Sequence, residues 1–523
     1  MKVVEDKVLI FSCPNDIAQM VTGYIDKSQV LQTRGDVAEV AMFWGLDEAQ
    51  RLARIAPTSI KVPSPIERDY QWPGMFSPFD HQRDTARFLT LHRRAFCFNE
   101  AGTGKTSAAI WAADYLMDQG LVKRVLVICP LSIMHSAWQA DLFKTAMHRT
   151  CGVAHGSYNK RTKIIKGGYE FVIINFDGVN TVEKEIAQGG FDLIIVDEAN
   201  CYGLPTTRRW KALAKIIRPD TFLWMMTGTP AAQSPLNALG MAKLVNPTAV
   251  PNYITAWRDK VMLKISTFKW IPKPDAKDTV FKVLQPAIRF TKAQCLDLPP
   301  VLKTTREVDM TPQQWKYYRL IKDNMLAHAA GEVISAVNKA AIVNKLLQIS
   351  CGAVYTEDKE VVEFDATPRM NLLLEILQET ERKVIIFALF RSSIDIIVQF
   401  LEKNGHTVGV IHGDVSATRR GDIINRFQHT PDPRVLVMQP QATAHGITLT
   451  AADTVVFFGP LMSVEQYLQC IARADRKGQN SDKVTVVHIQ SSPIEKKMFL
   501  AMDGRATDHS LLTQMFDAEM EVP

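Results

Sequence analysis

The sequence predicts an α/β protein with two lobes, each built on a parallel β-sheet. Short apolar runs rich in β-branched residues alternate with helical stretches over residues 95–227 and again over 383–489. Strands that are apolar along their whole length and separated by helices are typical of parallel sheets covered on both faces. The chain has 523 residues, of which 46% are hydrophobic and 22% charged. This composition is typical of globular proteins and leaves room for about three domains.

Residues 1–75 are predicted to form a small α+β domain before the first lobe. DKVLIF and EVAMFW have the character of strands, and DEAQRLARI has that of a helix. The proline-rich stretch KVPSPIERDYQWPGMFSP then marks a linker.

The first lobe is expected over residues 76–300 and the second over 301–505. The expected strands of the first are AFCF, RVLVICP, FVIINF, FDLIIVDE and FLWMMTGT, and those of the second are KVIIFALF, TVGVIHG, RVLVMQP, TVVFFG and KVTVVHI. Between them, residues 236–380 are expected to be helical and irregular, with a long helix over 311–350, and to decorate the lobes as insertions. Residues 506–523 are expected to form a tail ending in a helix.

Composition excludes several classes of protein. No apolar run approaches the roughly 18 residues that cross a bilayer, and the N-terminal apolar stretch is too short for a signal peptide. We therefore expect no membrane association and a cytoplasmic location, in a bacterium or a virus-infected cell. The eight Cys are scattered without a CxxC pair, which indicates reduced thiols rather than disulfides or a zinc site. A net charge of +6 permits a polyanionic partner without identifying one.

The first expected strand leads into the loop NEAGTGKT, which has the character of a phosphate-binding loop. Gly102 and Gly104 let the backbone turn and direct its N–H groups at an anion, together with Thr103. Lys105 supplies a positive charge, and the hydroxyl of Thr106 suits Mg²⁺. Asn99 stands where this motif has its first glycine.

Carboxylates and small hydroxyl residues end two further strands. FDLIIVDEAN ends in Asp197, which is placed to hold a metal ion, and Glu198, which is placed to orient or deprotonate an attacking water. FLWMMTGTP ends in Thr227, Gly228 and Thr229, which could couple hydrolysis to a polynucleotide surface. Taken separately, each pattern is also typical of a solvated turn.

In the second lobe, LQCIARADRKGQ spaces Gln469, Arg473 and Arg476 as if on one face of a helix. Arginines so placed commonly form a solvated, ion-paired surface. The alternative is that they are arginine fingers, which stabilise charge on a transferring phosphoryl group. Fingers in one lobe and a phosphate loop in the other would require the lobes to close for hydrolysis.

These motifs, in this order, resemble those of the superfamily 2 nucleic-acid motors, and within them the Swi/Snf-type double-stranded DNA translocases. FSPFDHQRDTARFL resembles the glutamine motif, NEAGTGKT is similar to DExGxGKT, and VLVICPLSIMHSAWQADLF is similar to LVVxPxSxxxxWxxEF. VDEAN is similar to DEAH with Asn200 in place of His, and TGTPAAQSPLNAL to TGTPxxxxxxEL. QATAHGITLTAADTVVFF and QCIARADRKGQN resemble AxGxGLxLTAADxVxxF and QAxxRxxRxGQ. The resemblance covers about residues 76–490.

The resemblance implies two RecA-like lobes that use ATP and Mg²⁺ to step along duplex DNA. It implies that Gln82 recognises adenine and that Gly446 approaches the nucleotide or backbone closely. Gln479 points to the translocase branch, and the compact chain resembles the annealing-helicase subgroup, in a bacterium or bacterial virus. Expected activities are remodelling forks, annealing strands or displacing bound proteins.

Nucleic-acid partners are expected to be double-stranded or branched DNA, bound through its phosphates. The candidate contacts are Pro130, Ser132, Gly228, Thr229, His412, Gly413, Thr443 and Thr448. Single-strand DNA-binding, replication or recombination proteins are candidate partners, and the chain is expected to be a monomer. Residues 1–75 either help engage branched or single-stranded DNA or cap the first lobe. A strand-separating DNA or RNA helicase and an ATP-gated nucleic-acid scaffold remain as alternative functions.

Overall fold

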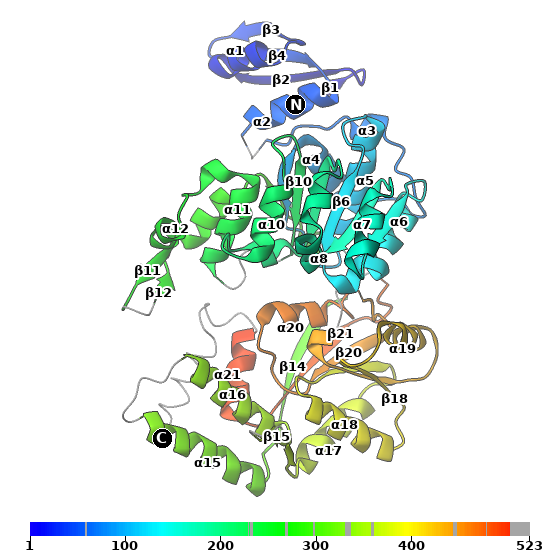
Figure 1. The fold of residues 1–523 in the computed structure, drawn as a ribbon, viewed down its shortest axis with the longest axis vertical. Helices are drawn as coiled ribbons and strands as arrows, with labels where there is room; N and C mark the ends of the chain where they lie inside the picture. The colour runs from blue at the N-terminus through cyan, green and yellow to red at the C-terminus, as the bar shows by residue number, and fades with distance from the viewer. Residues whose placement is uncertain are drawn as a thin grey trace. The chain divides into compact units, whose positions relative to one another are not determined.

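The fold is described from a computed structural model. It describes residues 1–57, 60–228, 230, 234–266, 270–295, 299–329, 336–356, 360–442, 447–476 and 478–502. The chain divides into two compact units, Met1–Cys295 and Leu296–Pro523, and Figure 1 labels their helices and strands. No helix in these ranges is both long and apolar enough to cross a membrane.

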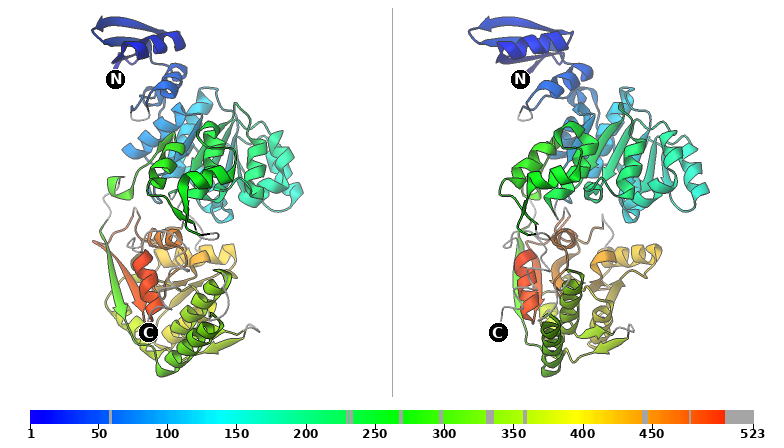
Figure 2. Two further views of the ribbon diagram at one scale, coloured as in Figure 1. Left: turned by 90° about the vertical axis from the view of Figure 1, so that its left-hand side faces the viewer. Right: turned by 60° about the vertical axis from the view of Figure 1, so that its left-hand side comes forward.

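The first unit begins with a small antiparallel sheet, drawn in dark blue in Figure 2. Its strand order is β1-β2-β4-β3. Its strands are β1 (Lys2–Val4), β2 (Val8–Pro14), β3 (Ser28–Arg34) and β4 (Val37–Phe43), and its helices are α1 (Asn15–Tyr24) and α2 (Leu46–Ile55). The predicted strands DKVLIF and EVAMFW and the predicted helix DEAQRLARI are confirmed as β2, β4 and α2. Leu9, Val21, Val40 and Leu52 are among the residues of its separate core, because alternate strand residues face α1 and α2.

Buried hydrogen bonds fix this small sheet domain to the larger domain of the same unit. Gln50 of α2 donates through Nε2 to the backbone oxygen of Thr90 at 2.8 Å, and the hydroxyls of Ser64 and Thr90 lie 2.8 Å apart. Thr90 belongs to α4 (Asp80–Leu91), and α3 (Ile66–Asp69) lies in the connecting segment. After α3, the hydroxyl of Tyr70 donates to Asp114 Oδ2 at 2.5 Å. The proline-rich segment is therefore packed against the larger domain.

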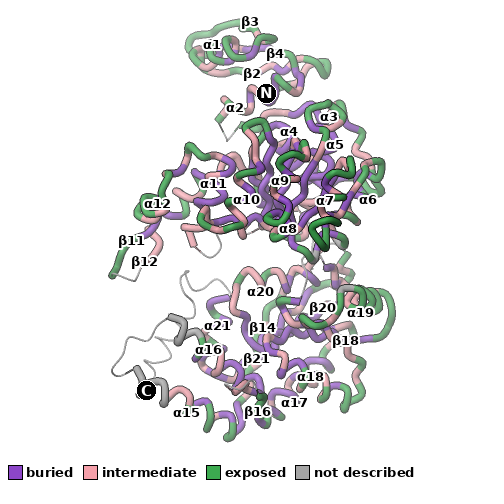
Figure 3. The backbone as a smooth tube through the Cα atoms, viewed as in Figure 1, coloured by how far each residue is buried: buried purple, intermediate pink, exposed green. Residues whose placement is uncertain are grey.

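The larger domain is built on a seven-stranded sheet with the order β13-β5-β10-β9-β6-β8-β7, and all its pairings are parallel. The strands are β5 (Arg94–Cys97), β6 (Val125–Cys129), β7 (Cys151–Ala154), β8 (Phe171–Asn175), β9 (Leu193–Asp197), β10 (Phe222–Met226) and β13 (Ala287–Ile288). Alternate residues of each strand enter two different cores: Ile195 packs in the core of α5 (Lys105–Asp118), and Ile194 in that of α10 (Arg208–Ile216) and α11 (Ala238–Val245). Figure 3 shows this sheet as mostly buried. The predicted parallel sheet covered on both faces is confirmed.

The remaining helices of the first unit surround this sheet or extend from it. They are α6 (Ala140–Thr145), α7 (Tyr158–Lys166), α8 (Phe176–Thr181), α9 (Glu183–Ala187), α12 (Ile254–Val261), α13 (Ala276–Val283) and α14 (Lys292–Cys295). A two-stranded hairpin of β11 (Met262–Lys264) and β12 (Trp270–Pro272) lies between α12 and α13.

The second unit has a six-stranded sheet with the order β14-β21-β20-β17-β19-β18, again with only parallel pairings. Its strands are β14 (Val301–Glu307), β17 (Lys383–Phe387), β18 (Val408–Ile411), β19 (Val435–Met438), β20 (Ala452–Phe457) and β21 (Val484–Gln490). Its helices are α15 (Pro312–Ala329), α16 (Ala336–Ser350), α17 (Thr367–Gln378), α18 (Arg391–Lys403), α19 (Ala417–His429), α20 (Val464–Ile471) and α21 (Pro493–Leu500). A short hairpin joins β15 (Ala353–Tyr355) and β16 (Val361–Glu363). Two α/β lobes are thus present, as the sequence predicts.

The segment 236–380 differs from its prediction because it also contains strands: the β11–β12 and β15–β16 hairpins, and β13 and β14. It was expected to be only helical and irregular, but β13 and β14 lie within it and form the edge strands of the two sheets. Neither strand has the long apolar run of a central strand: β13 has only two residues, and β14 has the mostly polar sequence VLKTTRE, with no fully buried position. The expected helix over 311–350 is present as α15 and α16. The tail expected at 506–523 lies outside the described residues.

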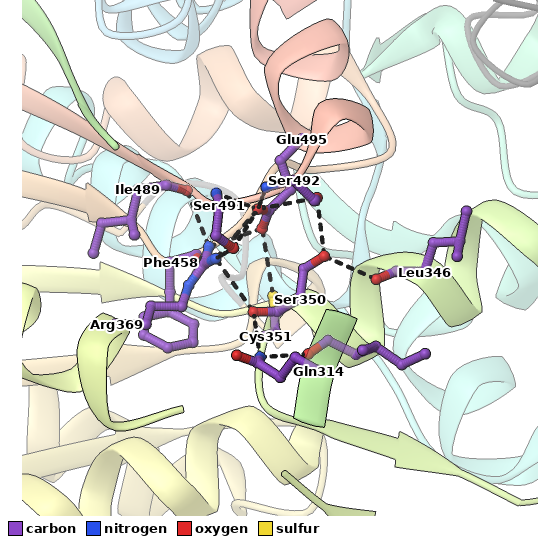
Figure 4. Close-up of polar contacts among 11 residues, drawn as sticks. Gln314, Leu346, Ser350, Cys351, Arg369, Phe458, Ile489, Ser491, Ser492 and Glu495 are labelled. Atoms are coloured by element: carbon purple, nitrogen blue, oxygen red, sulfur yellow. Dashed lines mark hydrogen bonds and ion pairs between the residues drawn. The ribbon is translucent and has the colours of Figure 1, made fainter. Parts of the chain in front are cut away.

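A buried ion pair between Arg369 of α17 and Glu495 of α21 holds the second unit together (Figure 4). Their side chains are 3% and 0% exposed, and Arg369 Nη2 lies 2.8 Å from Glu495 Oε1. Arg369 also donates to the backbone oxygens of Phe458, after β20, and Ile489, in β21. Glu495 Oε2 accepts from the backbone N–H of Ser491 at 2.7 Å. One guanidinium therefore joins two helices to the carboxyl ends of two central strands.

Candidate functional site

The carboxyl ends of three neighbouring strands, β5, β10 and β9, meet at one edge of the first sheet. β5 leads into the loop 98–104, β9 ends at Asp197, and β10 is followed by Thr227. The backbone N–H of Thr227 donates to the oxygen of Cys97 at 3.0 Å, which extends the pairing of β10 with β5. Parallel strands place such polar ends together, where ligands bind in α/β folds.

The loop 98–104 has the geometry of an anion cradle. Gly102 and Gly104 have φ angles of 91° and 77°, and α5 begins directly after Gly104. A Cβ on Gly104 would lie 2.0 Å from Nε2 of Gln82 and would have to adopt the positive φ, so a larger residue would displace Gln82 and strain the backbone. The free N–H groups and the dipole at the N-terminus of α5 favour a negatively charged ligand. This is the predicted strand–loop–helix arrangement.

Lys105, Thr106 and Thr103 sit where this loop meets α5. Lys105 Nζ lies 3.4 Å from the backbone oxygen of Glu100, so the ammonium group folds back across the loop. Thr103 is buried, and its hydroxyl donates to the same oxygen at 2.9 Å. Thr106 is half-buried at the second position of α5. The loop therefore concentrates one mobile cation and several donors around an anion-sized turn.

Asp197 is a buried carboxylate facing this loop. Its pKa is raised, because burial disfavours the charged form and the charge of Glu198 adds to this; the nearby Lys105 ammonium opposes the shift. The backbone N–H of Glu198 donates to Asp197 Oδ1 at 3.0 Å. Glu198 itself is half-buried and has a φ of 51°, a left-handed conformation that non-glycine residues rarely adopt and that is frequent at functional sites.

These side chains suit Mg²⁺, which prefers carboxylate and hydroxyl oxygens. A buried carboxylate with a raised pKa gains from a cation, and Asp197 and Thr106 are the residues that would supply the oxygen ligands. Bound there, the ion would neutralise charge on phosphate oxygens.

Trp138 belongs to this site, although the sequence analysis did not select it. It lies in a π-helical segment, Met134–Gln139, which follows the loop after β6. The indole is 1% exposed, and its Nε1 donates to Asp197 Oδ2 at 3.0 Å. Trp138 therefore orients the carboxylate that Mg²⁺ would need. Its place in the stretch similar to LVVxPxSxxxxWxxEF was the available signal.

Asn99 explains how this loop keeps its shape without the first glycine of the motif. Its side chain is 1% exposed; Nδ2 donates to the hydroxyl of Thr85 at 2.8 Å, and Oδ1 accepts from the N–H of Phe290 at 2.9 Å. The backbone N–H of Glu100 donates to the oxygen of Phe290 at 3.0 Å. The chain just after β13 therefore lines one side of the phosphate loop.

Gln82, predicted to recognise adenine, lies at the start of α4 beside the loop. Its side chain is buried; Oε1 accepts from the N–H of Phe79 at 3.0 Å, and Nε2 lies 3.4 Å from the oxygen of Gly104. The neighbouring His81 bonds to the oxygen of Thr103 at 2.8 Å through Nε2. Two consecutive side chains of α4 thus contact the loop.

In the second unit, the expectation of one helical face for Gln469, Arg473 and Arg476 was wrong. α20 ends at Ile471, and the next residues form tight turns, with Arg473 N–H bonded to Cys470 and Arg476 N–H to Ala474. The two arginines still converge, because Nη1 of each lies 3.4 and 3.5 Å from the backbone oxygen of Ile447.

Gln479 and Gln469 lie beside this pair. Gln479 Nε2 donates to the oxygens of Ala452 and Ala474 at 2.8 and 3.1 Å, which fixes the turn after α20 to the start of β20. Gln469, still within α20, lies 3.4 Å from Glu465 Oε1. A rigid turn, rather than a helix face, therefore presents the two guanidinium groups.

The candidate nucleic-acid contacts of the first unit lie at the edge that carries the phosphate loop. Pro130 follows β6, and Ser132 lies in the single turn Leu131–Ile133 after it. A Cβ on Gly228 would be 3.4 Å from the N atom of Ala101, so its backbone rests against the phosphate loop. Thr229 lies outside the described residues.

The candidate nucleic-acid contacts of the second unit belong to two segments of the chain. His412 and Gly413 follow β18, where the N–H of Gly413 lies 3.4 Å from Gln439 Oε1, a side chain that the sequence analysis did not select. Burial, and then the charge of Arg391, lower the pKa of His412, so its ring is neutral near pH 7. Thr448 is half-buried next to Ile447. Thr443 and Gly446 lie outside the described residues.

Comparison with known families gives two matches along the chain. The SNF2-related domain family matches residues 81–351. The helicase conserved C-terminal domain matches residues 368–478. The two matches cover the phosphate loop with its carboxylates and the converging arginines, respectively.

Several individual proteins have low but extended sequence similarity to this chain. An uncharacterised ATP-dependent helicase of Mycoplasma genitalium is 26% identical over 409 residues, which is 76% of this chain and 38% of that protein. Chromodomain-helicase-DNA-binding protein 8 of Xenopus tropicalis is 25% identical over 533 residues, covering 91% of this chain and 24% of that protein. The chain thus spans less than half the length of these relatives. A solved SWI2/SNF2 ATPase core of Sulfolobus solfataricus in complex with dsDNA is 20% identical, with a TM-score of 0.42, and the alignment covers 86% of this chain and 95% of that one.

Proposed function

Because the chain belongs to the SNF2-related family of superfamily 2, the Swi/Snf type, we propose that it is a DNA-dependent ATPase that translocates on double-stranded DNA. The observation that carries the proposal is the pairing of a phosphate loop with a buried carboxylate at one sheet edge. Lys105 is close enough to Asp197 to influence its pKa. A cation and a metal-binding anion so placed suit a nucleoside triphosphate with its Mg²⁺.

In the proposed mechanism, each side chain has one task. The N-terminus of α5 and Lys105 bind the β- and γ-phosphates. Asp197 and Thr106 would hold Mg²⁺, and the bound ion would supply positive charge to the phosphate oxygens. Glu198 orients the attacking water and accepts its proton. Gln82 contacts adenine, and Gly446 and Gln469 complete the nucleotide site.

Arg473 and Arg476 of the second lobe would stabilise the negative charge that develops on the transferring phosphoryl group. Such guanidinium groups contribute about 10³–10⁵ in rate. Their shared contact with Ile447 supports joint movement, since one turn carries both. Because these arginines belong to a different unit from the phosphate loop, hydrolysis would require the two units to bring these groups together. That dependence is how hydrolysis could drive stepping along DNA.

The DNA-facing part of the proposal rests on the loops at the sheet edges. Ser132, Gly228, Thr229, His412, Gly413, Thr443 and Thr448 would donate to phosphates through backbone N–H groups or polar side chains, and Pro130, which has no N–H, would make only van der Waals contact. Contacts with phosphates do not distinguish one base from another, so the activity would be independent of the DNA sequence. Fork remodelling, strand annealing or displacement of bound proteins are the outcomes of such movement.

We expect double-stranded DNA to stimulate ATP hydrolysis more than single-stranded DNA or RNA of equal length. Phosphate release with each nucleic acid in turn measures this. Displacement of a triplex-forming strand from duplex DNA measures translocation, because a moving motor removes the third strand without separating the duplex. Stimulation mainly by RNA would contradict the proposal and favour an RNA helicase. ATP binding with no stimulated turnover would favour a scaffold.

Trp138→Phe is expected to raise the Mg²⁺ concentration needed for half-maximal ATPase activity by about tenfold. The phenyl ring fills most of the space but cannot donate to Asp197, and loss of such a supporting hydrogen bond costs about 10–100-fold in metal affinity. The matched control is Trp210→Phe on α10. It removes a hydrogen bond of 2.8 Å that the Trp210 indole donates to the backbone oxygen of Gly240. Equal Mg²⁺ dependence of the two variants would exclude this role for Trp138.

A further inference from the structure

A basic protrusion lies on the first unit, away from the motifs that carry the proposed ATPase function. It spans residues 250–284 and consists of α12, the β11–β12 hairpin and α13. In Figure 1, α12 and the hairpin extend away from the seven-stranded sheet. We name it the 250–284 protrusion.

The protrusion holds most of the net charge of the chain. Its 35 residues contain seven Lys and Arg but only three Asp, a net charge of +4, whereas the whole chain of 523 residues has +6. Lys260, Lys264, Lys277 and Lys282 are exposed. None of these four forms an ion pair with a carboxylate in the part of the chain that is described. Concentrated, unneutralised positive charge favours a polyanion.

One face of the protrusion is already occupied. Trp257, Val261, Met262, Ala276 and Val283 are buried in a core of the first unit. Trp270 lies between Arg258 and Lys264, whose charged groups are 5.5 and 5.9 Å from its ring centre. The protrusion is therefore anchored by its inner side, and its lysines lie on a supported scaffold.

The protrusion also exposes aromatic rings. Tyr253, just before α12, is 75% exposed, and Phe281 of α13 is 69% exposed. Lys277 and Phe281 are four residues apart on α13, so they share a helix face. Exposed aromatic rings beside lysines are what proteins use to stack unpaired bases while binding phosphates. Paired bases in a duplex do not offer their faces in this way.

From this combination we propose that the 250–284 protrusion binds single-stranded DNA. Phe281 and Tyr253 would stack on bases, and the exposed lysines would bind phosphates. The inference rests on the proposed function only in taking DNA as the polyanion. In a DNA translocase it would hold an unpaired strand at a fork. It assigns a task to a helical segment that none of the conserved motifs includes.

The test is direct binding of labelled oligo-dT and of duplex DNA of equal length, measured by fluorescence anisotropy without nucleotide. The variant Phe281→Ala with Lys282→Glu is expected to weaken oligo-dT binding about tenfold or more, because one stacked base and one phosphate contact are lost. The slope of log affinity against log salt should fall by about 0.7, the value for one single-strand phosphate. Duplex binding should change less than threefold.

The matched control is Phe143→Ala with Lys144→Glu, which also removes an exposed Phe and the exposed Lys that follows it, but on α6. The control should bind oligo-dT as the unaltered protein does, and both variants should keep its ATPase rate without DNA. Equal oligo-dT affinity of the variant, the control and the unaltered protein would overturn the proposal. So would an equal loss of duplex binding. Because binding is measured without ATP, a failure here is distinct from a failure of the proposed ATPase.

Discussion

Lys105→Ala is expected to reduce the kcat/KM of ATP hydrolysis by at least about a hundredfold, because one preorganised cationic donor at the phosphates is removed. Loss of a single such donor typically costs about 10²–10³ in rate. Lys105 lies at the first position of α5, and its ammonium folds over the loop to within 3.4 Å of the oxygen of Glu100. Steady-state phosphate release at saturating DNA measures the effect.

Comparison with Glu198→Gln separates binding from chemistry. This variant keeps the size of the side chain and one acceptor oxygen but cannot act as a base, so we expect ATP affinity to be retained while turnover falls. Lys105→Ala should lower both the ATP affinity and the turnover. Lys123→Ala, at an exposed position of the same unit, serves as the control and should leave both unchanged. Normal turnover by Glu198→Gln would refute the assigned roles.

Arg369→Ala is expected to destabilise the second unit by about 3–5 kcal/mol, because it leaves the buried carboxylate of Glu495 without its cation. Several donors also disappear at once, including those to the oxygens of Phe458 and Ile489. Amide hydrogen exchange in peptides from β17, β20 and β21 reports this unit specifically. A loss of about 3 kcal/mol corresponds to exchange roughly a hundredfold faster where these strands exchange by unfolding of the unit.

Arg306→Ala is the matched control for that experiment. Arg306 pairs with Glu379 at 2.7 Å in the same unit, but the two side chains are 40% and 53% exposed. Solvent screening limits such a pair to about 0–1 kcal/mol, so exchange should change only slightly. Equal effects of the two substitutions would show that the Arg369 pair is no more important than a surface contact.

The central strands of both sheets could be predicted because they are apolar along their whole length. β6, β9, β17 and β20 contain the unbroken apolar runs VLVIC, LIIV, VIIF and VVF, a pattern typical of strands buried on both faces. The edge strands β13 and β14 could not be predicted in this way. An edge strand pairs on one side only, and β14 keeps Lys303 and Arg306 among its hydrophobic residues.

The phosphate loop and its carboxylates could be placed from sequence because each directly follows a predictable strand. Asn99 and Trp138 could not be given their tasks, since both act through partners distant in the chain: Phe290 for Asn99 and Asp197 for Trp138. The arginine turn was mistaken for helix because the spacing of Gln469, Arg473 and Arg476 also fits a helical period. α20 ends at Ile471 because of local backbone hydrogen bonds, and these bonds leave no pattern in the sequence from which the end of the helix could be predicted.

β13 lies far along the chain from β5, the strand with which it pairs, and this matters for the design of truncated fragments. The N–H groups of Phe96, Phe98 and Glu100 bond to the oxygens of Pro286, Ile288 and Phe290. A truncated first lobe that stopped before Pro286 would expose the outer edge of β5, and unpaired strand edges recruit other molecules into aggregates. Fragments that retain residues up to 292 would keep that edge covered and remain dispersed.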